Sequence, residues 1–293
     1  MKKLTYISVP LWQGAEKEGV ELAPKSFIDA GADTILRQYY EVEHVSLPPI
    51  SQELHGDNKY AVMAQYVTHL KQVVANCLTM GSFPFVVGGD HTIGLGSVAA
   101  SVEKYDNLGI IWFDAHGDMN TEATSQTGHM HGMPLAALMG FCTSELNKVT
   151  TRYIKPENIF WVGTRSLDPG EKELIEKLHL HIYSAAYVKS FGMRNVMKQI
   201  QMELQRLHIT HLHCSMDVDA MDPRIVPATG VTEPNGLDIE EYISFVSELA
   251  HLPIQLTSLD CVEYNPLLDD NKKHTLQICL KAIDTLFRKL NQA

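Results

Sequence analysis

Four short apolar runs of this chain each lead directly into acidic residues or histidines, and this feature constrains the fold most strongly. The runs and their polar continuations are Phe83–Val87 before Gly88-Gly89-Asp90-His91, Leu108–Phe113 before Asp114-Ala115-His116-Gly117-Asp118, His211–Met216 before Asp217-Val218-Asp219, and Ile254–Leu259 before Asp260. Nearly continuous runs rich in β-branched and aromatic residues are typical of strands buried on both faces. Ligands of parallel sheets bind beyond the carboxyl ends of the strands. The pattern therefore predicts a polar site at one edge of a sheet.

Amphipathic segments separate these runs. Residues 59–80 place Val67, Leu70 and Val74 at helical spacing. Further strands are expected at Leu4–Val9 and Ile159–Val162, and further helices at Pro24–Tyr39, Glu171–Leu178, Asn195–Leu207, Ile239–Leu249 and Lys273–Leu290. The alternation predicts an α/β fold with a mostly parallel sheet and right-handed crossovers. Because no repeat, low-complexity tract or linker divides the chain, we expect residues 1–293 to form a single domain.

The composition excludes several classes of partner and compartment. With 24 Lys and Arg against 35 Asp and Glu, the formal charge of -11 disfavours nucleic acid and anionic membranes. No apolar run approaches the ~18 residues that span a bilayer, and Pro10 interrupts the amino-terminal segment too early for a signal peptide. The 5 cysteines include no Cys-x-x-Cys pair, which argues against a disulfide framework. We expect a cytoplasmic protein.

The polar strand ends together form a candidate metal site. Asp114, His116 and Asp118 alternate along the chain, so in an extended conformation they would share one side, and Asp217 and Asp219 repeat this spacing. An oxygen-rich set with some nitrogen suits Mn²⁺ better than tetrahedral zinc. The candidate ligands are His91, Asp114, His116, Asp118, Asp217 and Asp219. The alternatives are turn or capping clusters at each strand end and a phosphate loop around Gly88 and Gly89, although no Gly-Lys-Ser/Thr follows.

Three ordered motifs resemble those of the ureohydrolase (arginase/agmatinase) family. They are Val87-Gly88-Gly89-Asp90-His91, Ile110–Asp118, and Ser215–Asp219 with Pro223, Pro227, Ala228 and Gly236 at the expected intervals. The resemblance extends over essentially the whole chain, and bacterial arginases are the most similar members. It implies a three-layer αβα sandwich, two Mn²⁺ ions per chain held by the six candidate ligands, and a homotrimer or homohexamer.

The resemblance also implies a reaction, in which a metal-bridging hydroxide hydrolyses the guanidinium group of L-arginine to L-ornithine and urea. Glu263 resembles the family's carboxylate that holds the guanidinium group. His131 matches the family's proton-transfer histidine, whose ordinary pKa lies near neutrality. Asp118 is assigned both to the catalytic set and to the metal ligands. Asp260 is expected only to satisfy backbone donors.

Substrate recognition is also carried over from the resemblance. Asn120 and Thr127 fall where arginases bind an α-carboxylate, and Asp168 and Glu171 fall where they recognise the α-ammonium group. For these two acids the alternative is a turn followed by a helix amino terminus. Because an amino-acid substrate requires recognition at both ends, arginine is favoured over agmatine. His129 replaces an asparagine that arginases usually carry beside the substrate.

Two departures from the family pattern leave the substrate open. His129 is larger than asparagine, and Val231 replaces a threonine whose hydroxyl would help to position Glu263 or the guanidinium. The enzymatic alternatives are a formimidoylglutamase and an agmatinase or guanidinobutyrase. A metal-dependent deacetylase of related fold would use one metal, usually zinc, and a non-catalytic relative would lack ligands. A nucleophilic serine hydrolase is disfavoured because the chain contains no Gly-x-Ser-x-Gly elbow.

Overall fold

The computed structural model describes residues 2–51, 54, 56, 58–143 and 145–292. Within that part of the chain the strands are β1 Lys2–Val9, β2 Tyr40–Ser46, β3 Ser82–Gly88, β4 Leu108–Phe113, β5 Ile159–Val162, β6 His181–Tyr183, β7 His211–Asp217 and β8 Gln255–Val262. They form one 8-stranded sheet in the order β2-β1-β3-β8-β7-β4-β5-β6. Every strand pairs parallel to its neighbours, which confirms the predicted parallel sheet.

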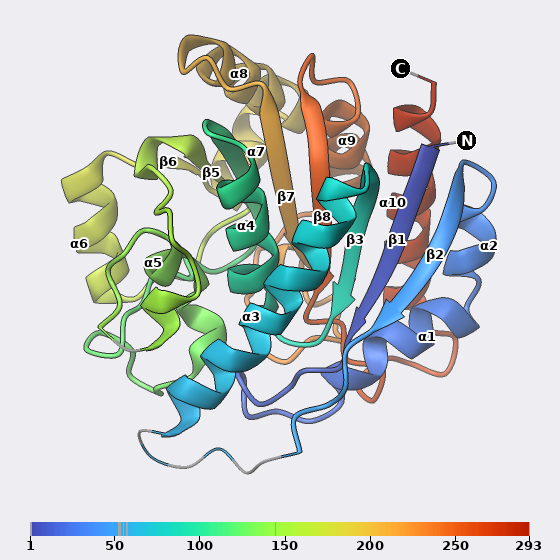
Figure 1. Ribbon diagram of the computed structural model, residues 1–293. Coiled ribbons are helices and arrows are strands. Elements are labelled where there is room, and N and C mark those ends of the chain that lie inside the picture. Colours follow the sequence, from blue (N-terminus) through green and yellow to red (C-terminus); the bar gives the residue numbers. More distant parts are fainter. Residues whose placement is uncertain (1, 52–53, 55, 57, 144, 293) are drawn as a thin grey trace.

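Helices cover both faces of the sheet (Figure 1). The α-helices are α1 Ala23–Asp29, α2 Ala32–Leu36, α3 Asn58–Thr79, α4 Ile93–Lys104, α5 Pro134–Leu138, α6 Pro169–Leu178, α7 Ala185–Phe191, α8 Met193–Arg206, α9 Ile239–Leu249 and α10 His274–Leu290. The 3-10 helices are η1 Val20–Leu22, η2 Met130–Gly132, η3 Glu145–Lys148, η4 Pro156–Asn158 and η5 Val218–Ala220. One apolar cluster joins the sheet to α1, α2 and α7 to α10, and a second joins it to α3, α4, α5 and α6. The expected three-layer αβα sandwich is therefore confirmed.

The differences from the predicted elements have physical causes. The two strands that the apolar runs do not indicate, β2 and β6, lie at the two edges of the sheet, where burial on both faces is not required. The predicted helix Pro24–Tyr39 is two helices, because Gly31 adopts φ 101° between them. Helix α4 is buried along nearly its whole length, so its sequence lacks the polar stripe by which amphipathic helices are recognised.

The four strands with polar continuations, β3, β8, β7 and β4, are neighbours in the centre of the sheet. The carboxyl ends of these parallel strands lie together along one side of the sheet, toward which the arrowheads of β1, β2 and β3 point in Figure 1. The two ends of the chain lie close to each other at the opposite side, where the strands begin (Figure 1). The fold therefore brings the four polar segments together, as the sequence predicts.

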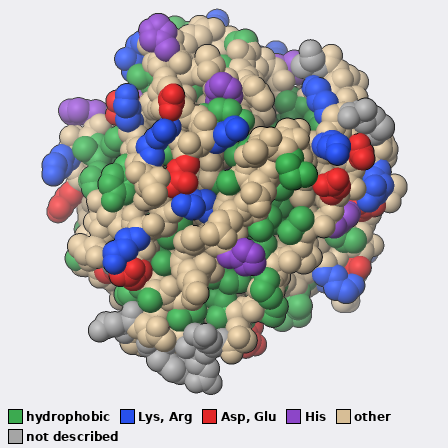
Figure 2. Space-filling model, viewed as in Figure 1, with side chains coloured by type: hydrophobic (Ala, Val, Ile, Leu, Met, Phe, Trp, Pro, Cys, Tyr) green, Lys and Arg blue, Asp and Glu red, His purple; other side chains and the backbone are tan. Residues whose placement is uncertain are grey.

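The charges on one face of the molecule, the cysteines and the helices can be compared with the expectations from composition. On the face in Figure 2, acidic and basic side chains are interspersed. All 5 cysteines are buried and free. None of the helices in the described part of the chain combines the length and apolar character that a membrane crossing requires.

The contact between Gly89 and the segment after β1 tests this architecture. Gly89 N–H donates to the Val9 carbonyl over 3.1 Å and Asp90 N–H to the Leu11 carbonyl over 2.9 Å. A Cβ at position 89 would lie 1.7 Å from the Leu11 oxygen. We expect Gly89→Ala to destabilise the protein by about 1–3 kcal/mol through overpacking, measured by denaturant unfolding.

Gly132→Ala is the matched control for this substitution. A Cβ at position 132 would meet nothing within 4 Å. The free energy of unfolding of the Gly132→Ala protein should therefore match that of the wild type. A Gly89→Ala protein as stable as the Gly132→Ala protein would show that the close approach is not required.

Candidate metal centre and active site

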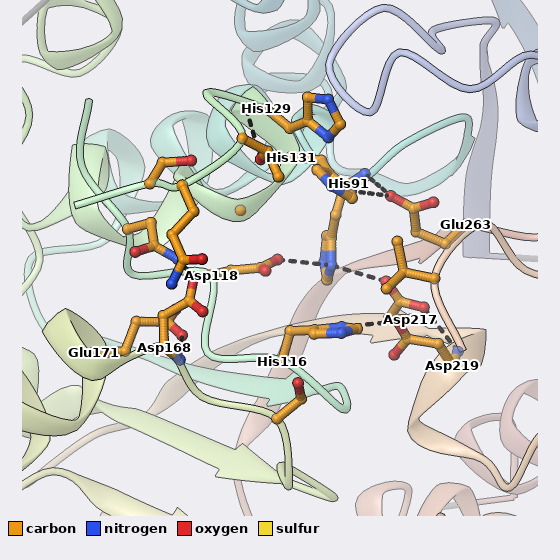
Figure 3. A pocket seen from close by; sticks show the side chains of 17 residues that line it. His91, His116, Asp118, His129, His131, Asp168, Glu171, Asp217, Asp219 and Glu263 are labelled. Atoms are coloured by element: carbon orange, nitrogen blue, oxygen red, sulfur yellow. Dashed lines mark hydrogen bonds and ion pairs between the residues drawn. The ribbon is translucent and has the colours of Figure 1, made fainter. Parts of the chain in front are cut away.

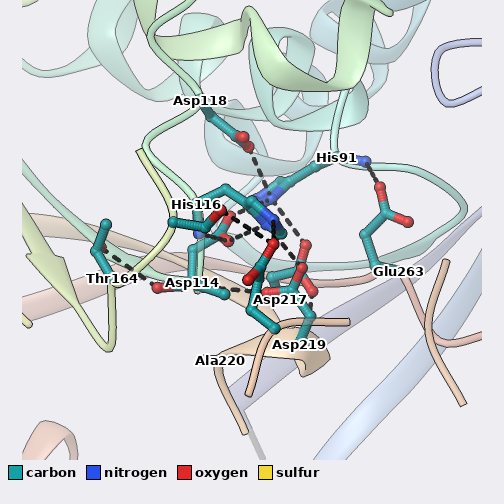
Figure 4. Close-up of polar contacts among 12 residues, drawn as sticks. His91, Asp114, His116, Asp118, Thr164, Asp217, Asp219, Ala220 and Glu263 are labelled. Atoms are coloured by element: carbon teal, nitrogen blue, oxygen red, sulfur yellow. Dashed lines mark hydrogen bonds and ion pairs between the residues drawn. The ribbon is translucent and has the colours of Figure 1, made fainter. Parts of the chain in front are cut away.

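Two overlapping groups of ligand atoms lie at the carboxyl edge of the central strands (Figure 4). The first comprises His91, Asp114 and Asp118, the second Asp114, His116 and Asp219, and the ligand atoms of each group lie within 4.8 Å of one another. The sixth predicted ligand, Asp217, places its Oδ2 3.2 Å from His91 Nδ1. The structure thus brings all six predicted ligands together, with Asp114 shared between two potential cation positions.

Backbone turns, rather than strand alternation, orient these side chains. Strand β4 ends at Phe113, so the expectation that Asp114, His116 and Asp118 share a side of an extended strand is wrong. Asp114 Oδ1 instead accepts the backbone N–H of His116 over 2.7 Å, and Asp217 Oδ1 accepts that of Asp219 over 2.8 Å. Each turn leaves Oδ2 facing His91 Nδ1, at 2.8 Å for Asp114 and 3.2 Å for Asp217.

The donor set fits divalent cations. Three buried atoms converge, because Asp114 Oδ2 and Asp118 Oδ2 lie 2.8 and 3.1 Å from His91 Nδ1. Outside this cluster none of the three has a hydrogen-bond partner among the described residues. Burial and the neighbouring Asp114 raise the pKa of Asp118 to about 6. Burial and the carboxylates of Asp219 and Asp114 raise the pKa of Asp217 well above its usual range. Bound cations would satisfy the unpartnered atoms and relieve this repulsion.

A buried hydrogen-bond network supports His91 from behind. Ser215 Oγ lies 2.9 Å from His91 Nε2 and donates to Asp260 Oδ2 over 3.2 Å. The same Asp260 oxygen lies 3.0 Å from His213 Nε2 and accepts from Ser97 Oγ over 2.6 Å. Asp260 is therefore bound by side chains, and the expectation that it only satisfies backbone donors is wrong. Such partners fix the orientation of a ligating imidazole.

Ser215 is not among the predicted site residues, although the sequence carries a signal for it. Ser215 precedes Asp217 by two residues on β7, so both side chains emerge on the same side of the strand. A hydroxyl at that spacing lies directly behind a ligand cluster.

Glu263 and His131 form an ion pair beside the cluster (Figure 3). Glu263 Oε1 lies 3.0 Å from His131 Nδ1 and also accepts the backbone N–H of His91 over 2.9 Å. Glu263 adopts φ 63° and Asp118 φ 52°, and left-handed backbone of this kind at non-glycine residues often marks functional sites. Burial lowers the pKa of His131, but its hydrogen bond to Glu263 and the nearby carboxylates outweigh this and raise the pKa to about 9.

The loop around Gly14, between β1 and η1, holds His131 in place. The Gly14 carbonyl accepts the backbone N–H groups of Met130 over 2.8 Å and of His131 over 3.3 Å. The carboxylate of the buried Asp90 in turn accepts the Gly14 N–H over 2.8 Å. Asp90 thus acts on the site through backbone positioning rather than by facing the cluster.

A cavity of about 200 Å³ joins the ligand cluster to a polar outer wall. It is lined by all the predicted catalytic and substrate-binding residues and by five of the six predicted ligands: His91, His116, Asp118, Asn120, Thr127, His129, His131, Asp168, Glu171, Asp217, Asp219 and Glu263. Asp114 alone of the predicted set does not line it. Ser125, Gln126, Ser166 and Val231 also face the cavity; of these, Ser125 and Gln126 share the loop of Asn120 and Thr127.

Asp168 and Glu171 begin helix α6. They form a capping box, which confirms the helix-terminus interpretation of these acids. Both Glu171 oxygens are engaged, Oε1 by Met119 N–H and Oε2 by Asp168 N–H, each over 2.9 Å. Asp168 Oδ2 accepts from Asn120 Nδ2 over 2.8 Å. Because both acids also line the cavity, capping does not exclude substrate contact.

His129 lies at the mouth of the cavity, above His131 in Figure 3. Its Nε2 is 3.8 Å from Glu16 Oε2, and its ring centroid is 5.9 Å from that of His131. Burial and the neighbouring His131 lower the pKa of His129 despite Glu16. In this structure His129 therefore favours the neutral form at neutral pH.

Comparison with known proteins identifies the family. The model of the protein family described as "Arginase family" matches residues 2–288 of this chain. The chain belongs to the arginase family. The arginase of Staphylococcus aureus (strain MRSA252) is 35% identical over 98% of this chain and 97% of its own. The arginase of Bacillus caldovelox is 36% identical over 98% of each chain.

Solved structures agree with this assignment. The crystal structure of Entamoeba histolytica arginase in complex with L-ornithine has a TM-score of 0.92 and 33% identity, covering 98% of both chains. The native Bacillus caldovelox arginase structure has a TM-score of 0.92 and 36% identity, also over 98% of both chains. The predicted arginase-type hydrolase, which acts on carbon–nitrogen bonds of linear amidines, is confirmed as the class of this enzyme.

The ion pair of Glu263 and His131 gives a prediction for the metal-free protein. In the metal-free protein, Glu263→Gln should lower the pKa of His131 from about 9 toward its ordinary value, because the carboxylate that stabilises the imidazolium is lost. Histidine NMR titration measures this directly. Glu16→Gln, which changes an acid near His129 instead, should leave the pKa of His131 in place. An unchanged pKa in Glu263→Gln would contradict the assigned pair.

Proposed function

We propose that this protein hydrolyses the guanidinium group of L-arginine to L-ornithine and urea with two Mn²⁺ ions. The observation that carries the proposal is the single cavity that connects the His and Asp cluster to Asn120, Thr127 and Asp168. One end can hold a guanidinium group and the other an amino-acid head group. The complex of Entamoeba histolytica arginase with L-ornithine supports this choice of substrate.

The ligand cluster determines where the reaction takes place. The first cation would be held by His91, Asp114, Asp118 and Asp217, and the second by Asp114, His116 and Asp219. When bound, the cations make a water molecule acidic enough to be a nucleophile at neutral pH. Oxygen and nitrogen ligands without thiolate favour Mn²⁺ among such cations.

Glu263 and His131 handle the substrate beside the cations. In the described structure both side-chain hydrogen bonds of Glu263 use Oε1, so Oε2 is available to accept from the guanidinium in a charge-assisted pair. The raised pKa of His131 keeps it protonated at neutral pH. It can therefore donate a proton to the leaving amine as the carbon–nitrogen bond breaks.

The outer wall selects the amino-acid end. The Thr127 hydroxyl can donate to an α-carboxylate, because its hydrogen bond with the His129 N–H, over 3.2 Å, uses it only as an acceptor. Asp168 supplies negative charge for an α-ammonium group at the same wall. A substrate without the carboxylate would leave Thr127 unused, which favours arginine over agmatine.

We also propose that residues 1–293 form one catalytic domain that works in the cytoplasm as a homotrimer or homohexamer. The unbroken sheet from β1 to β8 supports a single domain. The 5 buried, free cysteines suit a reducing compartment.

A substrate panel tests the reaction. We expect metal-loaded protein to release urea and ornithine from arginine faster than it hydrolyses agmatine, guanidinobutyrate or formiminoglutamate. Formiminoglutamate as the preferred substrate would favour the formimidoylglutamase, one of the alternatives that Val231 leaves open. One zinc per chain, with no turnover of the panel, would instead support a deacetylase.

Thr127→Val tests the outer wall with a nearly isosteric change. Loss of one hydrogen bond should raise the KM for arginine about fivefold, or ~1 kcal/mol, and leave the KM for agmatine unchanged. Thr121→Val is the matched control, because Thr121 lies in the same loop but does not line the cavity. Equal effects of Thr127→Val on both substrates would contradict carboxylate recognition at this residue.

A further inference from the structure

Glu233 lies beside His116 and is neither a predicted metal ligand nor a predicted substrate-binding residue. Its Oε1 accepts from Ser166 Oγ over 3.0 Å and lies 3.8 Å from His116 Nε2. The Glu233 side chain is 31% exposed. Because solvent screens the charge of such a carboxylate, it acts only on groups close to it. His116 is the member of the ligand cluster that lies this close.

The two nitrogens of His116 face different surroundings. Nδ1 points into the cluster, 2.9 Å from Asp219 Oδ2. Nε2 is buried and has no hydrogen-bond partner in the described part of the chain. An imidazole that binds a cation through Nδ1 carries its proton on Nε2, and a buried N–H requires an acceptor. Glu233 Oε1 is the carboxylate oxygen placed to accept it after a movement of about 1 Å.

The backbone around Glu233 is fixed independently of its carboxylate. The Arg165 guanidinium donates to the carbonyls of Glu233 over 2.7 Å and Pro234 over 3.0 Å. It also donates to the carbonyls of Asp219, Ala220 and Met221, at 2.9, 3.0 and 3.1 Å. One side chain thus ties the segment of Glu233 to the segment that carries Asp219. Removing only the carboxylate would leave these bonds in place.

We propose that Glu233 is a positioning residue that orients His116 through Nε2 and strengthens cation binding in the group of Asp114, His116 and Asp219. Ser166 holds the carboxylate in place for this contact. The inference rests on the proposed function in one respect, the use of His116 as a metal ligand.

Titration of the metal-free protein with Mn²⁺, followed by calorimetry and electron paramagnetic resonance, tests the proposal. Glu233→Ala should weaken one of two binding events about 10–100-fold and leave the other within about twofold. Glu233→Gln should lose less, because its amide oxygen still accepts from Nε2–H. Both metal-free variants should melt near the wild-type temperature, because Arg165 still binds the backbone at position 233 and Glu233→Ala loses only the part-exposed hydrogen bond from Ser166.

Glu16→Gln is the matched control, since it removes one negative charge beside the cavity mouth without touching His116. Its two binding events should equal those of the wild type. The role of Glu233 would be overturned by wild-type affinity in Glu233→Ala, by equal weakening of both events, or by an equal loss in Glu16→Gln. A Glu233→Ala protein that is largely unfolded without metal would overturn it as well. Failure of the wild type to bind Mn²⁺ would instead overturn the proposed function, and the inference with it.

Discussion

Four carboxylates, those of Asp114, Asp118, Asp217 and Asp219, are buried together at one edge of the sheet. Their repulsion and desolvation oppose folding unless positive charge is supplied. The surrounding structure is arranged around this constraint. Two imidazoles enter the cluster, two Asx turns direct one oxygen of Asp114 and one of Asp217 inward, and a buried network holds His91. A cluster of this kind is costly as a purely structural element, whereas cations turn the same repulsion into binding energy.

The centre of the fold could be predicted from the sequence because burial determines both its composition and its place. Runs such as Leu108–Phe113 are apolar throughout since both of their faces are covered, and their polar continuations had to meet at one edge. The edge strands β2 and β6 lacked that signal, as did α4, which is too deeply buried to show a polar stripe. A continuous apolar run indicates a strand covered on both faces, so a partly covered edge strand does not show it. An apolar stripe indicates a helix with one buried face, so a helix buried on all sides does not show it.

The convergence of the six candidate ligands could be predicted, but the contacts that support them could not. His91 and the aspartates stand at motif spacings, whereas Ser166 and Glu233 are 67 residues apart and meet where Arg165, the neighbour of Ser166, donates to the carbonyl of Glu233. Backbone acceptors leave no trace in residue identity. For the same reason the Gly14 carbonyl, which positions His131, could be found only in the folded chain.

Strand β8 lies in the middle of the sheet, between β3 and β7, although it is the last strand along the chain. During synthesis the two halves of the sheet are therefore made long before the strand that joins them, and each exposes an unpaired inner edge. Glu263 follows this strand directly. A polypeptide that ends before Glu263 therefore lacks a residue that lines the cavity, and the candidate active site can form only after β8 has been made.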